Sequence, residues 1–267
     1  MTVSAELKKY FKKRIEAINS LLKRPQRFFA SEDYHKIRVE IKKTKALFAV
    51  MEFCTHEFDS KHHYKIFKPI FKKAGEVRDL QLEIQEIDNY KLSDCFPGYL
   101  QWLNEKKDSA TVDFFSIVND GLRKDIHDIS KSITQSLEHV HKKEIDNFIG
   151  ERKEKIIRLM KKRNSTNEEI HATRKLLKEF FYTKKMITSK DIPVTKTEEL
   201  QDMLGKWHDN LVMADHLQQG MDVDKIHAEE RKRIRSLRTK IVEKKDLLFK
   251  KISEMKPDFL QSFRLQS

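Results

Sequence analysis

The chain has few of the residues that interrupt helices. It has six glycines and five prolines among 267 residues, and both residue types are unfavourable in the interior of a helix. This scarcity goes with a charged fraction of 36%, which is typical of helices whose exposed faces are rich in salt bridges. The composition therefore favours an all-α fold.

Cysteine and long apolar runs are also scarce. Cys54 and Cys95 are the only cysteines, which excludes a disulfide framework and the paired-cysteine pattern of zinc sites. The sequence has no apolar run of the roughly 20 residues that cross a bilayer, and its first fifteen residues lack the apolar centre of a signal peptide. We therefore expect a cytoplasmic protein with no membrane partner.

Acidic residues are outnumbered by basic ones. The sequence has 55 lysines and arginines against 42 aspartates and glutamates, which gives a formal net charge of +13. Such an excess attracts polyanions, although charge alone does not distinguish one kind of polyanion from another.

One segment of the sequence occurs twice. Ser31 to Lys45 reads S-E-D-Y-H-K-I-R-V-E-I-K-K-T-K, and Asn167 to Lys178 reads N-E-E-I-H-A-T-R-K-L-L-K. Each copy starts with a residue that can cap a helix and continues with two acids, which suit the positive end of the helix dipole. We call these segments the signature helices and expect Ser31 and Asn167 to be their caps.

Each signature helix has a row of basic side chains on one face. At about 100° per residue the first row falls within an arc of roughly 80° and the second within about 60°. Apolar residues flank both rows, so each row should lie beside packed faces. An ordinary solvated helix face is the simplest alternative, and the duplication, histidine included, argues against it. The rows consist of His35, Arg38, Lys42 and Lys45 in the first helix, and His171, Arg174, Lys178 and Lys185 in the second.

A second, shorter pair of matching segments follows the signature helices. Ala74 to Leu80 contains G-x-x-R-D, and Leu204 to Leu211 contains L-G-x-x-H-D. With the histidine-led rows, these segments resemble the CHAD family, the conserved histidine α-helical domain, over almost the whole chain. The resemblance implies two four-helix halves related by a pseudo-twofold axis. It also implies a basic central surface that binds inorganic polyphosphate without hydrolysing it.

The resemblance further implies which residues bind the polymer. Two positions depart from the family pattern: Phe181 replaces an arginine, and His208 stands where the first half has Arg78. The resemblance thus implies weaker anion binding in the second half. The implied polyphosphate-binding residues are His35, Arg38, Lys42, Lys43, Lys45 and Arg78 in the first half, and His171, Arg174, Lys175 and Lys178 in the second.

Three further arginines near the C-terminus have the spacing of a single helix face. Arg231, Arg235 and Arg238 are four and three residues apart, so they project together from a helix. They would form one wall of the anion groove, or a solvated face laced with salt bridges to Glu229 and Glu230. The spacing leaves both interpretations open, and we include the three arginines among the candidate polyphosphate-binding residues.

Helix breakers and apolar periodicity divide the chain into eight predicted helices. We expect the fifth helix to break or kink near Gly150 and the eighth to end before Pro257, with residues 258–267 as a loose tail. Residues 1–120 would form the first four-helix half and residues 121–257 the second, packed as one unit within a single CHAD domain that spans residues 1–267. The predicted helices span about residues 4–23, 32–58, 68–90, 99–118, 122–162, 168–189, 196–219 and 224–255.

Two other functions fit the basic composition. A nucleic-acid-binding protein with a basic cleft would usually interleave aromatic and basic residues for base stacking, whereas the aromatics here fall mostly on packing faces. A metal-dependent phosphohydrolase would use His208 and Asp209, but it needs carboxylates that converge on a metal. We therefore predict a non-enzymatic module without cofactor or metal. It would bind polyphosphate along a central basic groove lined by the signature helices, and would also attract other polyanions.

Overall fold

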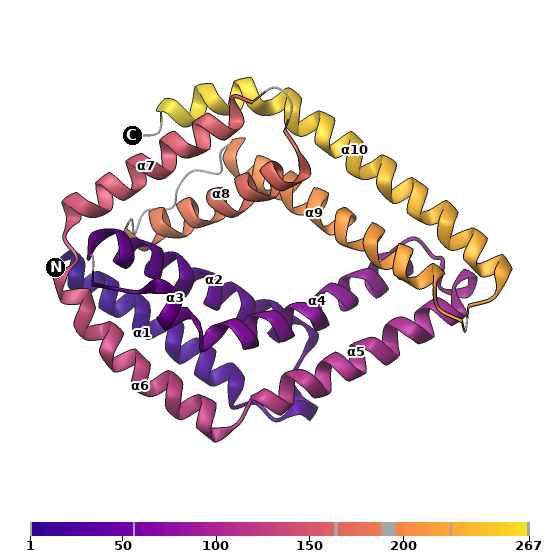
Figure 1. Ribbon diagram of the computed structural model, residues 1–267, viewed down its shortest axis with the longest axis horizontal. Coiled ribbons are helices and arrows are strands. Elements are labelled where there is room, and N and C mark those ends of the chain that lie inside the picture. Colours follow the sequence, from indigo (N-terminus) through magenta and orange to yellow (C-terminus); the bar gives the residue numbers. More distant parts are fainter. Residues whose placement is uncertain (1, 56, 163–164, 188–195, 225, 266–267) are drawn as a thin grey trace. The chain divides into compact units, whose positions relative to one another are not determined.

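The structure is a computed structural model that describes residues 2–55, 57–162, 165–187, 196–224 and 226–265. Most of these residues are helical, and no strand occurs among them (Figure 1). This confirms the predicted all-α class. The α-helices are α1 (Val3–Leu22), α2 (Ser31–Cys54), α3 (Ser60–Tyr64), α4 (Phe67–Asn89), α5 (Pro97–Ile117), α6 (Asp120–Ser136), α7 (Lys142–Met160), α8 (Asn167–Ile187), α9 (Lys196–Met221) and α10 (Ala228–Leu265).

The chain divides into two compact units, each assembled from three stretches of sequence. Helices α4, α5, α7 and α8 contribute residues to both units. The predicted division at residue 120, the pseudo-twofold relation and the packing of the halves as one unit all stay predictions. The first unit comprises Met1–Arg78, Ser109–Lys155 and Lys178–Asp191, and the second comprises Asp79–Asp108, Ile156–Leu177 and Ile192–Ser267.

Aromatic side chains form much of the core of the first unit. Phe48 of α2 is fully buried, and its ring centroid lies 6.2 Å from that of Phe11 in α1 and 6.1 Å from that of Phe67 in α4. Tyr34, near the start of α2, packs edge to face on Phe114 of α5 with centroids 5.2 Å apart. These contacts fix the orientation of α2 about its axis, and with it the direction of its basic row.

The second helix is shorter than predicted, and a short helix follows it. Helix α2 ends at Cys54, where the Thr55 hydroxyl donates to the carbonyl oxygen of Met51 at 2.8 Å. The Asp59 carboxylate then caps α3 by accepting hydrogen bonds from the N–H groups of Lys61 and His62. Apolar periodicity misses α3 because a helix of five residues is shorter than two turns.

The predicted fifth helix is two helices, α6 and α7. The break lies at the 3-10 turn of Leu137–His139, and Gly150 is an ordinary residue inside α7. The predicted break at Gly150 is therefore wrong. Leu137 and Val140 are buried, so the turn is held by apolar packing, and it contains neither glycine nor proline to mark it in the sequence.

Helix α10 continues through Pro257 to Leu265, so the predicted end at Met255 and the loose tail are wrong over this range. A proline inside a helix costs about 3 kcal/mol. Phe259 and Phe263, beyond it, are fully buried and stack with centroids 4.8 Å apart. Burial of one such side chain contributes about 1.5–3 kcal/mol, and two of them offset the cost of the proline.

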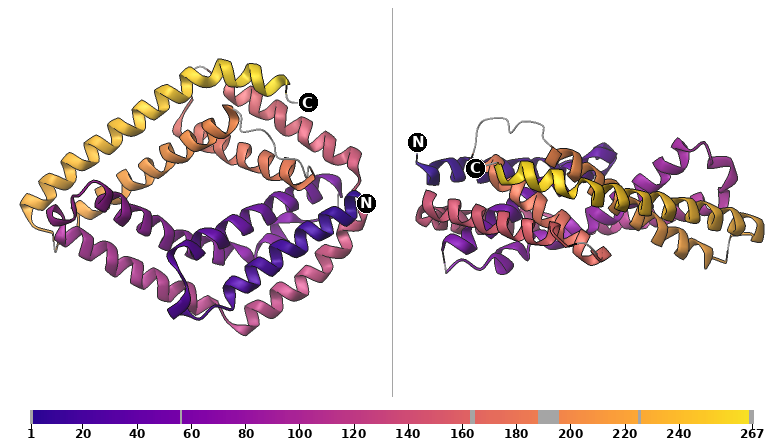
Figure 2. Two further views of the ribbon diagram at one scale, coloured as in Figure 1. Left: turned by 180° about the vertical axis from the view of Figure 1, so that it is seen from behind. Right: turned by 90° about the horizontal axis from the view of Figure 1, so that it is seen from above.

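In the second unit α10 packs along α9, as the two views in Figure 2 show. The Glu230 carboxylate of α10 is buried and accepts hydrogen bonds from the backbone N–H groups of Gly98 and Tyr99, at 3.3 and 2.7 Å. Both N–H groups lie in the first turn of α5, where a helix offers them no acceptor of its own. Gly220 of α9 lies so close to the Tyr99 ring that a Cβ atom at position 220 would be 2.1 Å from Cε2.

A buried carboxylate connects three helices of the same unit. Glu83 of α4 accepts a hydrogen bond from the Tyr99 hydroxyl of α5 at 2.5 Å, and its other oxygen lies 2.6 Å from Nδ1 of His216 in α9. Glu83 is 3% exposed, so its charge requires a close partner. The hydrogen bond to Glu83 raises the pKa of His216, whereas burial acts in the opposite direction.

This arrangement predicts that the second unit loses stability as the pH rises. The pKa of His216 is higher in the folded chain than its ordinary value of 6.5. Its contribution to stability is therefore complete below about pH 6.5 and is lost as the pH rises through the raised value. We expect the urea concentration at the midpoint of unfolding to decrease as the pH is raised from 6 to 9. The His216→Gln variant should have a flatter profile, and an equally steep profile in that variant would contradict the assignment.

Among the described residues, the helices lack the combination of length and apolar character needed to cross a membrane. The expected cytoplasmic location stays a prediction.

Candidate functional site

The first signature helix begins at Ser31, one residue after its cap. The Asp33 carboxylate, which is fully buried, accepts a hydrogen bond from the backbone N–H of Ala30 at 2.9 Å. It also accepts from the Arg24 guanidinium at 2.8 Å. The cap is therefore Ala30, and the prediction that Ser31 is the cap is wrong. Asp33 stands three residues after Ala30, which is the position from which an acidic side chain accepts the N–H group of the cap.

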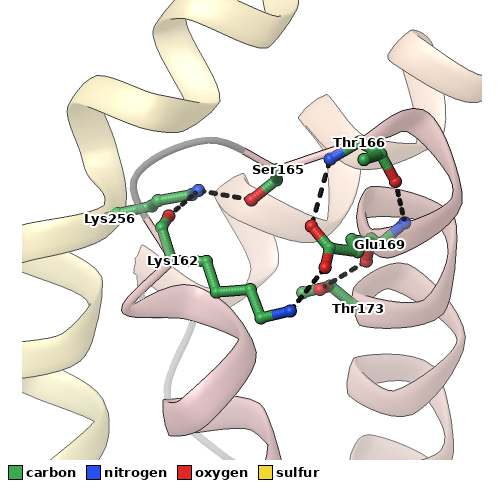
Figure 3. A network of polar contacts seen from close by, with 6 residues as sticks. All are labelled: Lys162, Ser165, Thr166, Glu169, Thr173 and Lys256. Atoms are coloured by element: carbon green, nitrogen blue, oxygen red, sulfur yellow. Dashed lines mark hydrogen bonds and ion pairs between the residues drawn. The ribbon is translucent and has the colours of Figure 1, made fainter.

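The second signature helix repeats this arrangement, as the close view in Figure 3 shows. The Glu169 carboxylate accepts from the backbone N–H of Thr166 at 3.1 Å, and the Thr166 hydroxyl accepts from the N–H of Glu169 at 3.3 Å. Lys162 binds the same carboxylate, as Arg24 does in the first copy. Asn167 is thus the first residue of α8 and not its cap. The repeat therefore extends to the hydrogen bonds that start each helix.

Helix α10 is also tied to the start of α8. The Lys256 ammonium donates to the carbonyl oxygen of Lys162 at 2.9 Å and to the Ser165 hydroxyl at 3.0 Å (Figure 3). Burial lowers the pKa of Lys256, and the nearby Glu169 opposes this effect. Lys162, Ser165 and Thr166, which precede α8, are therefore held by side chains of α8 and α10, which fixes where the basic row of α8 begins.

The basic row of α2 lies against aromatic rings. The Arg38 guanidinium is 5.1 Å from the centroid of Phe71 in α4, and the Lys42 ammonium is 5.7 Å from the same ring. The Lys45 ammonium is 4.9 Å from the centroid of Tyr64 in α3. Such cation–π contacts orient a cation without neutralising it. These three cations of the row are therefore ordered by the rings.

Gly75 gives Arg38 the space that it occupies. A Cβ atom at position 75 would lie 3.0 Å from one terminal nitrogen of Arg38 and 3.2 Å from the guanidinium carbon. At Gly205, the matching position of the repeat, a Cβ atom would meet no heavy atom within 4 Å. Gly75, the glycine of the G-x-x-R-D segment, thus leaves room for the Arg38 guanidinium beside α4.

His35 lies within the electrostatic range of three of the predicted cations. Burial lowers its pKa, the positive charges of Arg78, Lys42 and Arg38 lower it further, and Glu32 opposes them. The Arg78 guanidinium lies 3.9 Å from the Glu32 carboxylate. The structure therefore brings Arg78, from the second sequence segment, to the histidine of the first.

Lys43 has different neighbours from the rest of the first set. Its ammonium lies 2.7 Å from the Glu40 carboxylate, which is also 3.0 Å from Nε of Arg14 in α1. All three side chains are at least half-buried. Lys43 therefore belongs to an ion cluster between α1 and α2, and its contact with a polyanion stays a prediction.

The histidine of the second row lies beside a histidine of α9. His171 of α8 and His208 of α9 have ring centroids 4.9 Å apart, with their planes tilted by 38°. Burial lowers the pKa of His171, and the charges of Lys175 and Arg174 lower it further. Lys178 falls in the first unit. Phe181, which replaces a family arginine, is buried against Phe180.

The three arginines of α10 are not alike. The Arg231 guanidinium donates to the carbonyl oxygen of Val223 at 2.9 Å, and Nε of Arg238 donates to that of Ala214 at 3.3 Å. Arg235 is exposed. Arg231 and Arg238 therefore help to hold α10 on α9 and its connecting turn, while Arg235 projects into solvent. A role for the three in binding stays a prediction.

The described residues contain no group of three or more His, Cys, Asp and Glu side chains placed to hold a metal ion. The basic rows of α2 and α8, with Arg78 and His208 of the neighbouring helices, consist of cations and imidazoles. Such groups suit the recognition of an anion with several oxygens. Sequence reasoning left His208 out of the site. The sequence signal for His208 is its alignment with Arg78 when the G-x-x-H-D segment is matched to the G-x-x-R-D segment.

Comparisons with known proteins agree with the sequence resemblance. The family model of the CHAD domain matches residues 13–218. The chain is similar in structure to PptA from Streptomyces chartreusis, with a TM-score of 0.69 and 11% identity over 95% of this chain and 100% of that chain. It is also similar to the CHAD domain from the plant Ricinus communis, with a TM-score of 0.73 and 12% identity over 99% of this chain and 91% of that chain. At these identities the two structures support the fold alone. No curated protein matches the chain.

Proposed function

Because this chain belongs to the CHAD family, for which polyphosphate binding is a known association, we propose that it binds inorganic polyphosphate. The observation that supports this most is the cluster of His35, Arg38, Lys42 and Arg78 in the first unit. These side chains come from α2 and α4, and two of them are ordered on the Phe71 ring. Linear polyphosphate offers closely spaced negative charges to such a cluster.

We propose that the rows of α2 and α8 contact one polymer along a basic groove. The support is the repeat itself, since both helices start with the same pattern of hydrogen bonds and carry histidine and arginine at equivalent positions. A helical turn rises about 5.4 Å, so successive members of a row would meet successive parts of the chain of phosphates.

We also propose that the protein binds the polymer without cleaving it. Hydrolysis of a phosphoanhydride by a metal-dependent enzyme needs carboxylates that hold the metal and a water molecule. The charged side chains around His35 and His171 are mainly cations, which stabilise bound phosphate but do not by themselves supply such a metal site.

One observation favours nucleic acid as the second candidate ligand. Phe28 is 64% exposed, and the Arg27 guanidinium lies 4.7 Å from its ring centroid. An exposed aromatic ring beside an arginine is the kind of platform on which an unpaired base stacks. Phe28 lies outside the basic rows, however, and the cations of α2 lie on Phe71 and Tyr64, so the site favours a ligand without bases.

Calorimetric titration with polyphosphate of defined length tests the proposed function. We expect saturable binding at physiological salt, with a log affinity that falls as log salt rises, because bound cations displace counterions. In parallel, incubation with Mg²⁺ or Mn²⁺ should release no orthophosphate above a protein-free control. Absence of binding would reject the proposal, and release of orthophosphate would reject its non-enzymatic part.

A matched pair of glycine variants tests the role of Gly75. Alanine at position 75 should move the Arg38 guanidinium by a few tenths of an ångström, because the added Cβ would be 3.0 Å from it. We expect Gly75→Ala to lower the affinity for polyphosphate several-fold and Gly205→Ala to leave it unchanged. Gly205→Ala should also raise the free energy of unfolding by about 0.5–1 kcal/mol. Equal affinities for the two variants would contradict this role of Gly75.

A further inference from the structure

We propose that His208 binds phosphate together with His171. In the second half of the repeat this pair of imidazoles would take the place of His35 and Arg78 in the first half. This inference rests on the proposed function and adds to the site a residue that the sequence resemblance does not supply. Its consequence is that polyphosphate binding in the second unit takes up protons.

The geometry of the pair suits one phosphate group. The rings of His171 and His208 come from different helices, have centroids 4.9 Å apart and are both half-buried. Each ring can donate an N–H group to an oxygen, and a phosphate group has several acceptor oxygens. A phosphate bound to both rings would also bridge α8 and α9.

The internal repeat gives an independent reason. His208 occupies the position of Arg78 in the glycine-led segment. In the first unit Arg78 lies close enough to His35 for its charge to lower the pKa of that histidine. The same two positions therefore bring together histidine and arginine in the first unit, and histidine and histidine in the second.

The charges around the pair determine its dependence on pH. Two imidazolium ions at this separation repel each other, and the adjacent cations of α8 act in the same direction. Burial and the charges of Lys175 and Arg174 favour the neutral form of His171 in the free protein, and a bound polyanion would favour the charged form of both rings. Helix α10, which packs on α9, brings one guanidinium to the carbonyl oxygen of Ala214. The charges of Lys175 and Arg174 on α8 act on His171, Lys206 and Asp209 flank His208 on α9, and Arg238 lies on α10.

The sign of the effect follows from these shifts. The pKa of His171 in the free protein lies below its ordinary value of 6.5, and bound phosphate would raise it. Affinity should therefore be lowest above the raised value, should increase as the pH falls through it, and should level off below the lowered value of the free protein. A range from about pH 8 to pH 5 covers this change around the ordinary imidazole pKa.

Two reciprocal substitutions test the proposal, each measured by calorimetry with polyphosphate of defined length. His208→Arg restores the residue of the first unit and should tighten binding at pH 8 by about fivefold, as expected when a charged hydrogen bond replaces a neutral one. It should also reduce the number of protons taken up, which is measured by titration in two buffers of different ionisation enthalpy. Arg78→His should weaken binding at pH 8 and increase proton uptake.

Controls separate this inference from the proposed function. His127→Gln, a change at an exposed histidine, should alter neither affinity nor proton uptake. His208→Gln removes the titrating group without adding charge, and it should reduce proton uptake even if the arginine variant folds poorly. If the unaltered protein binds no polyphosphate, the proposed function fails. If that protein binds but the His208 variants have its affinity and its proton uptake, the function stands and this inference is wrong.

Discussion

Replacing Arg38 by glutamate should weaken polyphosphate binding by at least about 10- to 150-fold at physiological salt. Loss of one charge-assisted hydrogen bond costs about 1.5–3 kcal/mol, and the new carboxylate adds repulsion. Arg38 is ordered on Phe71 and fitted against Gly75, so little reorganisation precedes contact with a phosphate. We expect a similar loss for Arg174→Glu, since Arg174 has the same place in the second signature helix.

Exposed lysines outside the rows provide the control. Lys143→Glu and Lys155→Glu make the same change in net charge at exposed positions of α7. Their effect acts only through the long-range field, which is largely screened beyond about 8 Å at physiological salt. Circular dichroism should establish that all four variants are folded. If they are folded and bind alike, the basic rows are ordinary solvated faces and the site is wrongly assigned.

The largest expected effect on stability comes from Gly220→Ala. The new methyl group would lie 2.1 Å from Cε2 of Tyr99, whose side chain is fully buried and donates a hydrogen bond to Glu83. Overpacking costs about 1–3 kcal/mol, and loss of a hydrogen bond to a charged group adds a comparable amount. We expect the free energy of unfolding to fall by about 2–5 kcal/mol, measured by urea denaturation.

Two further variants identify the cause of this loss. Gly205→Ala lies in the same helix and has open space around its Cβ position, so it should not destabilise the protein. The double variant Gly220→Ala with Tyr99→Leu should be destabilised by less than the sum of the single variants, because the smaller side chain relieves the clash. A Gly220→Ala protein as stable as the unaltered one would contradict the close packing of α9 on α5.

The sequence predicts helices well where apolar periodicity is long. The bounds of α1, α4 and α5 lie within two residues of their predicted limits, since each of these helices buries a long apolar face. Prediction fails where tertiary packing outweighs local preference. Pro257 remains inside α10 because Phe259 and Phe263 are buried beyond it, and the turn at Leu137–His139 has no breaker residue.

The candidate site was predicted in part, for reasons that lie in the repeat. The spacing of the first row identified side chains that share a helix face, and Arg78 does lie near His35. Spacing could not show that Arg14 of α1 joins the ion pair of Lys43 with Glu40, because that contact depends on how α1 packs on α2. Nor could it show that Gly75 makes room for Arg38. Each of these facts depends on a second helix.

Competition between polyphosphate and DNA tests the central claim most directly. The protein would be titrated with labelled polyphosphate at physiological salt, and unlabelled polyphosphate, single-stranded DNA and double-stranded DNA would be added at equal phosphate concentration. We predict that unlabelled polyphosphate displaces the label at a lower concentration than either DNA. Displacement by DNA at an equal or lower concentration would contradict the claim, and its loss in a Phe28→Ser variant would trace that binding to the exposed aromatic ring.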